Sequence, residues 1–264
     1  MQEHNSMNEN HNATTSSSPL VKDGGKRNWK AALIYIAVLV LTPLTLVVGT
    51  VLGDTNYILT SALVILFAMI PFFASFESRA PQARELVVLA VMCAIAVASR
   101  VAFIWLPAFK PMAAIIMITG IALGARTGFM AGAISALVSN FVFSQGPWTP
   151  WQMFAFGLAG FVFGLLADRG VIPRQNLNMK QKLAVSIGGA LFIVCILGII
   201  LDTCSVFTMV DIPEGPDGAI VIYASGFPLN CVHGAATFVT LFLVANPLLD
   251  KLHRISVKYG FGMQ

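Results

Sequence analysis

The sequence predicts an all-α integral membrane protein with about eight transmembrane helices: a six-helix core preceded by a two-helix hairpin. Of its 264 residues, 57% are apolar and only 11% are charged, with a mean hydropathy of +0.80. Soluble domains are about half apolar and about a quarter charged. A spanning helix needs about 20 mostly apolar residues. Apolar runs of about this length lie at 31–52, 57–76, 86–106, 111–125, 127–143, 151–167, 183–203 and 224–249.

Three parts are predicted along the chain. Residues 1–30 are rich in Asn, Ser, Thr and His and lack a hydrophobic stretch, which predicts a disordered cytoplasmic tail rather than a signal peptide. Residues 31–76 form the hairpin, and a hydrophilic link from Phe76 to Glu85 precedes the core at 84–264. The fourth and fifth runs are short, because about 15 residues cover about 22 Å of a bilayer core of about 30 Å. A deep or re-entrant loop is the alternative there.

Basic residues predict the orientation. With the amino terminus inside, an eight-span arrangement places fourteen of the sixteen Lys and Arg residues on the cytoplasmic side and leaves only Arg100 and Lys110 outside. Such an excess of cationic residues in cytoplasmic segments is typical of membrane proteins. We therefore expect a multi-pass protein of the cell membrane with both termini in the cytoplasm.

Several function classes are disfavoured. The net charge is +4, but the cations lie in short clusters between apolar runs, so topology explains them better than nucleic-acid binding. The four cysteines form no CxxC pair, and no second histidine lies near His233, so we expect neither a metal nor a disulfide, and no cofactor. GxxxxGK[ST], HExxH and GxSxG are absent, which disfavours ATP hydrolysis by this chain and the commonest hydrolase chemistries.

The stretch from Asn140 to Gln152, read as NFVFSQGPWTPWQ, is the leading candidate for an outer ligand-binding loop. Its prolines and glycine restrict the backbone, while Trp148 and Trp151 offer flat surfaces on which a planar ligand could stack. The amides of Asn140, Gln145 and Gln152 could then bind the polar edge of that ligand. The alternative is an aromatic belt at headgroup depth, where Trp is common.

Further polar residues are predicted near the same side of the membrane. Arg100 and Lys110 could pair with a phosphate, carboxylate or carbonyl of a ligand, or extend as long side chains to the interface. Asp202, Asn230 and His233 end the seventh run and open the eighth, so we expect them to converge with the Trp stretch. His233 could donate or accept a hydrogen bond with the ligand, or be satisfied by neighbouring backbone.

Small residues form a stripe on the third run. Ala90, Ala94 and Ala98 are four residues apart and share one helical face, where another helix can approach closely. The stripe indicates either a docking face for a partner or ordinary internal packing.

Residues 84–264 resemble the substrate-binding S components of energy-coupling factor (ECF) vitamin transporters. The resemblance rests on the AxxxA helix, on two short helices meeting at LGARTG, on an outer loop and on the basic end LHRISVKYG. It implies a six-helix fold that binds a vitamin at the outer face. It also implies partners, namely a membrane T component and two ATPase subunits, with the alanine stripe as the docking face and toppling of the subunit carrying substrate inward. The hairpin at 31–76 departs from the six-helix pattern of the family.

The sequence alone leaves alternatives for the identity of the ligand and for the functional class of the protein. NFVFSQGPWTPWQMFAFGLAGF looks like a cobalamin-related or uncharacterised subgroup, so a corrinoid leads and riboflavin follows. An intramembrane lipid-modifying enzyme that uses Asp202, His233 and Arg100 is the alternative class. A solitary secondary transporter is a third reading, but the internal repeat expected of one is not evident.

Overall fold

The computed structural model describes residues 57–77, 82–208 and 216–259, and every regular element in these ranges is a helix. The elements are α2 (Tyr57–Glu77), α3 (Ala83–Ala102), α4 (Met112–Leu123), α5 (Ala125–Phe143), α6 (Trp148–Asp168), α7 (Met179–Phe192), the π-helical segment η2 (Ile193–Leu197), α8 (Gly198–Thr208) and α9 (Pro216–Tyr259). Since α7, η2 and α8 form one uninterrupted helix of 30 residues, the described part holds seven helices, six of them after Gln82.

The all-α prediction is confirmed, and the number of spans is confirmed only in part. Four helices of the described part are long and apolar enough to cross a membrane: Ala83–Ala102, Trp148–Asp168, Met179–Thr208 and Asp217–Tyr259. The run predicted at 31–52 lies outside the described residues, while the run at 57–76 corresponds to α2.

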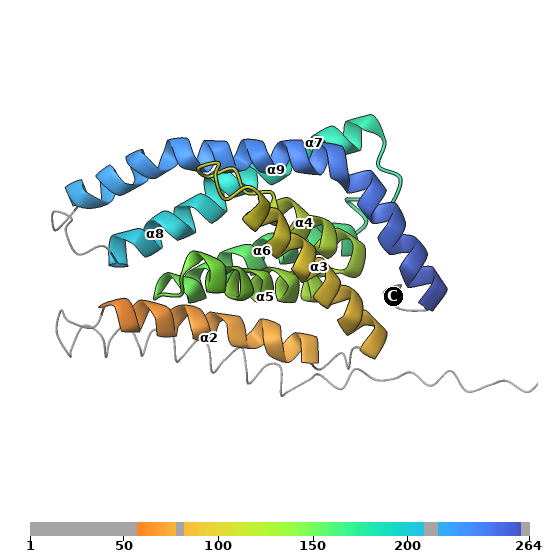
Figure 1. Ribbon diagram of the computed structural model, residues 1–264, viewed down its shortest axis with the longest axis horizontal. Helices are drawn as coiled ribbons and strands as arrows, with labels where there is room; N and C mark the ends of the chain where they lie inside the picture. The colour runs from red at the N-terminus through yellow and green to blue at the C-terminus, as the bar shows by residue number, and fades with distance from the viewer. Residues whose placement is uncertain (1–56, 78–81, 209–215, 260–264) are drawn as a thin grey trace, which may run out of the picture.

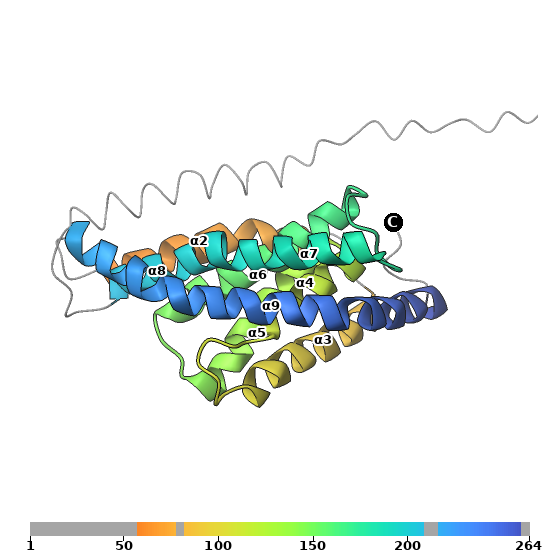
Figure 2. The same cartoon turned by 90° about the horizontal axis from the view of Figure 1, so that it is seen from above.

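The helices form an elongated bundle. α2 and α9 lie on opposite sides of it, with α4, α5 and α6 between them, and α3 crosses this central group obliquely (Figure 1). Seen from above, α9 runs along nearly the whole length of the bundle (Figure 2). We refer to the end that carries the connection from α5 to α6 as the Trp148 end, and to the end that carries the connection from α6 to α7 as the Asp168 end.

α4 is the centre of the core. Eleven of its twelve residues are buried, as expected for a helix that is apolar on every side. Its 12 residues span about 18 Å, so the predicted shortness of this run is confirmed. The sequence analysis left a re-entrant loop as an alternative, but the structure has two helices, α4 and α5, that meet at Gly124. Gly124 has φ +93°, a conformation that other residues rarely adopt.

Glycines bring α4, α5 and α6 into backbone contact. A β-carbon added at Gly120 of α4 would lie 2.1 Å from the carbonyl oxygen of Gly160 on α6, and one added at Gly160 would lie 2.1 Å from the carbonyl oxygen of Gly128 on α5. Small residues at such crossings are typical of membrane helices, because dispersion contacts, rather than the hydrophobic effect, hold helices together in lipid. The three helices therefore form a closely packed unit against which the other helices pack.

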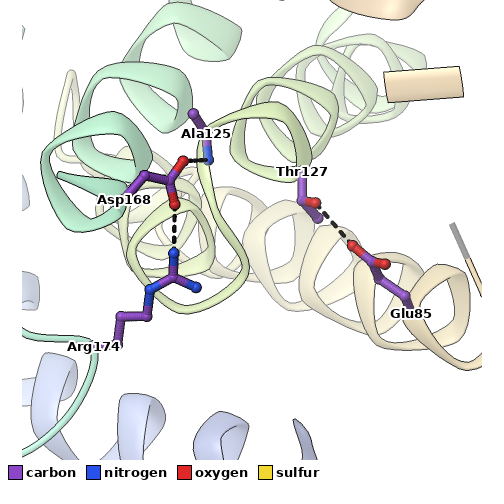
Figure 3. Close-up of polar contacts among 5 residues, drawn as sticks. All are labelled: Glu85, Ala125, Thr127, Asp168 and Arg174. Atoms are coloured by element: carbon purple, nitrogen blue, oxygen red, sulfur yellow. Dashed lines mark hydrogen bonds and ion pairs between the residues drawn. The ribbon is translucent and has the colours of Figure 1, made fainter. Parts of the chain in front are cut away.

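Polar contacts fix the Asp168 end (Figure 3). The Asp168 carboxylate accepts a hydrogen bond from the backbone N–H of Ala125 at 3.0 Å and forms an ion pair with Arg174. It thus satisfies a free N–H at the start of α5, where the helix dipole also favours an anion. Beside it, Thr127 Oγ1 donates to Glu85 Oε1 at 3.0 Å and joins α5 to α3.

Three predicted boundaries are wrong. α5 ends at Phe143, as the run at 127–143 predicts, but α6 begins at Trp148 rather than at 151, so Ser144–Pro147 alone connect the two helices. Pro147 and Pro150 are compatible with this helix start, because the first turn leaves its N–H groups without helical partners and Pro lacks one. α9 begins at Pro216 rather than near 224 and continues through the basic segment to Tyr259. α3 ends at Ala102 rather than 106, five residues before Pro107.

Candidate ligand site

Arg100 joins α3 to α5 at the Trp148 end. Its Nη1 donates hydrogen bonds to Ser139 Oγ and, at 3.1 Å, to Asn140 Oδ1. The guanidinium also lies over the Phe143 ring, 4.4 Å from its centroid, which adds a cation–π contact. Arg100 is therefore directed into the protein rather than out to the membrane surface.

Lys110 lies in the connection between α3 and α4, next to the same aromatic ring. Its Nζ is 5.1 Å from the Phe143 centroid and 3.4 Å from the carbonyl oxygen of Phe103. Burial lowers the pKa of Lys110, and the nearby charge of Arg100 lowers it further. The two predicted cations thus lie together at the Trp148 end.

Thr149 organises the turn between α5 and α6. Its hydroxyl accepts hydrogen bonds from Asn140 Nδ2 at 3.1 Å and from the Gly146 N–H at 3.2 Å, and donates to Gln145 Oε1 at 2.9 Å. The Gln145 amide also donates to the carbonyl oxygen of Leu137 at 3.0 Å. Asn140 and Gln145, predicted as ligand contacts, are therefore used in this structure to hold the turn together.

The two tryptophans have different environments. Trp148 is 38% exposed, lies against Gly146 and donates from Nε1 to the carbonyl oxygen of Ser144 at 3.4 Å. Trp151 is only 8% exposed and stacks on Phe207 of α8, with ring centroids 6.1 Å apart. Trp148 consequently has ring surface free for a ligand, whereas the Trp151 ring is part of the packing between helices.

Of the five buried side-chain atoms without a hydrogen-bond partner among the described residues, three belong to residues of the candidate site, and the other two, Ser135 Oγ and Asn246 Oδ1, do not. Trp151 Nε1, Gln152 Oε1 and His233 Nε2 are buried and have no hydrogen-bond partner among the described residues. Gln152 and Phe156 are one turn apart on α6 and share a face, and the Phe156 ring is 6.1 Å from that of His233 on α9. An unsatisfied buried polar group costs about 1–3 kcal/mol. A bound ligand that supplies partners would remove this cost.

Asp202 and Asn230 pair with each other between α8 and α9. Asn230 Nδ2 donates to Asp202 Oδ2 at 2.8 Å, and the Thr203 and Tyr223 hydroxyls are also 2.8 Å apart. Cys204 of α8 instead packs with Trp151. Of the three residues expected to converge with the Trp stretch, His233 lies against α6, while Asp202 and Asn230 bind each other.

The alanine stripe faces outward. Ala90, Ala94 and Ala98 are exposed on α3 next to Val87 and Val91, which are also exposed. No described helix covers this face, so the stripe is free to contact a partner or lipid.

Several residues of this site were not identified from the sequence. Thr149, Ser139, Phe143 and Phe207 contact the predicted residues directly. Thr149 lies within the stretch that the sequence analysis singled out, and Ser139 and Phe143 lie in or beside it. Phe207 lies more than fifty residues away along the chain, so sequence proximity gives no signal for it.

The described chain is all-helical, and four of its helices are long and apolar enough to cross a membrane, so the fold defines a multi-pass helical membrane protein. The sequence model of the ECF-type riboflavin transporter S component matches residues 81–254, and the chain belongs to this family. No curated protein and no solved structure matches the chain. ECF S components are transport subunits rather than enzymes, so the enzyme alternative is set aside.

Family membership also decides between the expectations about ligand and partners. It implies a riboflavin-like ligand, together with a T component and ATPase subunits as partners. The expected preference for cobalamin or a corrinoid precursor is not supported, because the matching family is of the riboflavin type.

Proposed function

We propose that this protein captures riboflavin or a close flavin analogue at the Trp148 end and delivers it across the cell membrane as part of an ECF transporter. The observation that carries the proposal is the set of buried, unpartnered atoms Trp151 Nε1, Gln152 Oε1 and His233 Nε2. They comprise a donor, an acceptor and an imidazole nitrogen that can act as either.

The chemistry of riboflavin suits this set. Its planar isoalloxazine ring presents a ring N–H between two carbonyl groups, and its ribityl chain carries hydroxyls. The Gln152 carbonyl can accept from the ring N–H, the Trp151 indole can donate to a carbonyl, and His233 can bind a hydroxyl. The exposed Trp148 ring offers a surface for stacking.

The orientation follows from the positive-inside rule. The Asp168 end carries Arg169, Arg174 and Lys180, and the end of α9 that lies there adds Lys251, Arg254 and Lys258. We assign this end and both termini to the cytoplasm, and the Trp148 end to the outside. Arg100 and Lys110 then lie at the outer end.

Energy for transport comes from other subunits in this proposal. The exposed face of α3 with Ala90, Ala94 and Ala98 is assigned to docking on the T component, which in turn binds two ATPase subunits. We assign substrate binding to residues 84–264 and the additional hairpin to 31–76, after a cytoplasmic tail at 1–30.

The test is equilibrium binding of riboflavin to the purified full-length protein, measured by quenching of flavin fluorescence, with FMN and cobalamin as competitors. Saturable quenching on riboflavin binding that cobalamin does not reverse supports the proposal. Binding of cobalamin alone, or of neither vitamin by folded protein, contradicts it. In proteoliposomes, uptake that requires the T component, both ATPase subunits and ATP distinguishes this function from a solitary secondary transporter.

A further inference from the structure

α2 lies outside the region that matches the family model, yet it packs against the ligand-binding domain. The match covers residues 81–254, whereas α2 spans Tyr57–Glu77. α2 contacts α5, α6 and α8, and it lies along the side of the bundle opposite α9 (Figure 1). Its role is therefore not given by the family.

One cluster of buried side chains joins α2 to a residue of the candidate site. Ile65 is 8% exposed and forms a cluster with Trp151 of α6 and Cys204 of α8. Phe207 stacks on Trp151 as well. Trp151 is thus enclosed by side chains of α2 and α8, and its Nε1 is left without a partner.

A second contact, further along α2, holds the helix in place. Phe72 stacks on Phe129 of α5, with centroids 4.1 Å apart and an interplanar angle of 8°. Phe129 is fully buried, and its ring lies so close to Gly157 of α6 that an added β-carbon there would be 2.8 Å from it. Met69 is also buried in this cluster. Because these aromatic side chains interlock, α2 has a defined register against α5 and α6.

We infer that α2 forms the lateral wall of the ligand site and that Ile65 is a positioning residue for Trp151. The inference rests on the proposed function, because it assigns α2 to the site that binds the flavin. The Ile65 side chain restricts the motion of the Trp151 ring and separates it from lipid. The indole N–H is thereby held in one orientation for the ligand, which lowers the entropy lost on binding.

The position of α2 separates this role from docking. α2 packs on α5, α6 and α8, and the alanine stripe of α3 is exposed with α2 in place. Substitutions at Ile65 are therefore expected to change ligand binding without changing assembly with the T component.

The experiment compares three alanine variants of α2 in the full-length protein, with riboflavin as the ligand. Ile65→Ala truncates the α2 side chain in the cluster that contains Trp151. Met69→Ala makes a comparable cavity in the cluster around Phe129, and Leu66→Ala truncates a side chain that is 41% exposed. We expect riboflavin to dissociate about tenfold faster from Ile65→Ala, which corresponds to about 1.4 kcal/mol. Riboflavin should dissociate from Met69→Ala and Leu66→Ala at the wild-type rate. From Ile65→Val, which keeps most of the side chain, it should dissociate at close to the wild-type rate.

A second readout needs no ligand. Brominated lipids quench tryptophan fluorescence on contact, and the contribution of Trp151 is obtained by subtracting the same measurement in a Trp151→Phe background. Quenching of Trp151 should rise in Ile65→Ala and stay at the wild-type level in the other two variants.

The two readouts separate the two proposals. Wild-type protein that binds no riboflavin contradicts the proposed function. Quenching by brominated lipids then still tests whether Ile65 of α2 shields Trp151 from lipid. Equal quenching in Ile65→Ala, Met69→Ala and Leu66→Ala overturns the inference. So does equal dissociation from these three variants in a protein that binds riboflavin.

Discussion

Asn140 of α5 donates a hydrogen bond from Nδ2 to the Thr149 hydroxyl of α6 at 3.1 Å, and through Asn140 Oδ1 this contact extends to Arg100 of α3. A continuous chain of hydrogen bonds therefore connects three helices at the end of the bundle where the candidate site lies. Satisfied polar networks in a low-dielectric interior favour one arrangement of the helices. The network thus gives the site a fixed frame.

Thr149→Val should loosen this frame. The valine is nearly the same shape but leaves Asn140 Nδ2, the Gly146 N–H and Gln145 Oε1 without their shared partner. We expect the free energy of unfolding to fall by about 1–3 kcal/mol, and riboflavin affinity to fall with it. Thermal unfolding in detergent, with and without riboflavin, measures both effects. The matched control is Thr240→Val, because the Thr240 hydroxyl donates only to Ala236 of its own helix; equal losses in the two variants would contradict the role of Thr149.

Gln152→Leu should affect stability and binding in different directions. Gln152 Oε1 is buried without a partner in the ligand-free protein, so an apolar side chain there should leave the free energy of unfolding unchanged or raise it by about 1 kcal/mol. Riboflavin affinity should fall, because the acceptor for the ligand is lost. Thermal unfolding and fluorescence titration test the two parts. The control is Gln181→Leu, which removes the capping box of α7 and should lower stability without lowering riboflavin affinity. A loss of stability without a loss of affinity in Gln152→Leu would contradict the role of Gln152 as an acceptor for the ligand.

Ala94→Leu should prevent assembly without preventing binding. Ala94 is exposed in the middle of the alanine stripe, and a larger side chain there would hold the partner helix away from α3. We expect affinity for the T component to fall about tenfold or more, with riboflavin affinity at the wild-type level. Co-purification with the T component measures the first quantity, and the control is Ala184→Leu at an exposed position of α7. Normal assembly of Ala94→Leu would exclude the stripe as the docking face.

The helices could be predicted from the sequence because each apolar run has a physical boundary. The turn between α4 and α5 was expected near 126 and lies at Gly124, where the positive φ requires glycine. The run at 183–203 lies within the helix Met179–Thr208. The early start of α9 was missed because Pro216 and Asp217 are typical of loops, although both also suit the first turn of a helix.

The site could be predicted only in outline. Trp148, Trp151, Gln152 and His233 were predicted from residue type and topology, and three of them, all except Trp148, carry a buried atom without a partner. The sequence could not indicate that Asn140 and Gln145 bind Thr149, since an amide bound to the protein and an amide bound to a ligand have the same sequence signal. The cluster that joins Ile65 to Trp151 could not be predicted either, because apolar helices in lipid give no periodic pattern that identifies the facing side chain.

Trp151→Phe tests whether the indole N–H, rather than the ring alone, serves the ligand. Phenylalanine can keep the stacking on Phe207 and the packing in the cluster with Ile65, while it removes the unpartnered Nε1. We expect a riboflavin affinity lower by about 1–2 kcal/mol with little change in the free energy of unfolding, because no hydrogen bond of the free protein is lost. Trp148→Ala should lower the affinity by about 1 kcal/mol if its exposed ring stacks on the flavin. Riboflavin titrations of both variants, each with its thermal unfolding curve, measure these effects. Since Trp151 is enclosed by α2 and α8 and Trp148 is not, Trp151→Ala should also lower stability, by about 3 kcal/mol or more, whereas Trp148→Ala should not. Wild-type affinity in both Trp151→Phe and Trp148→Ala would place the flavin away from the start of α6.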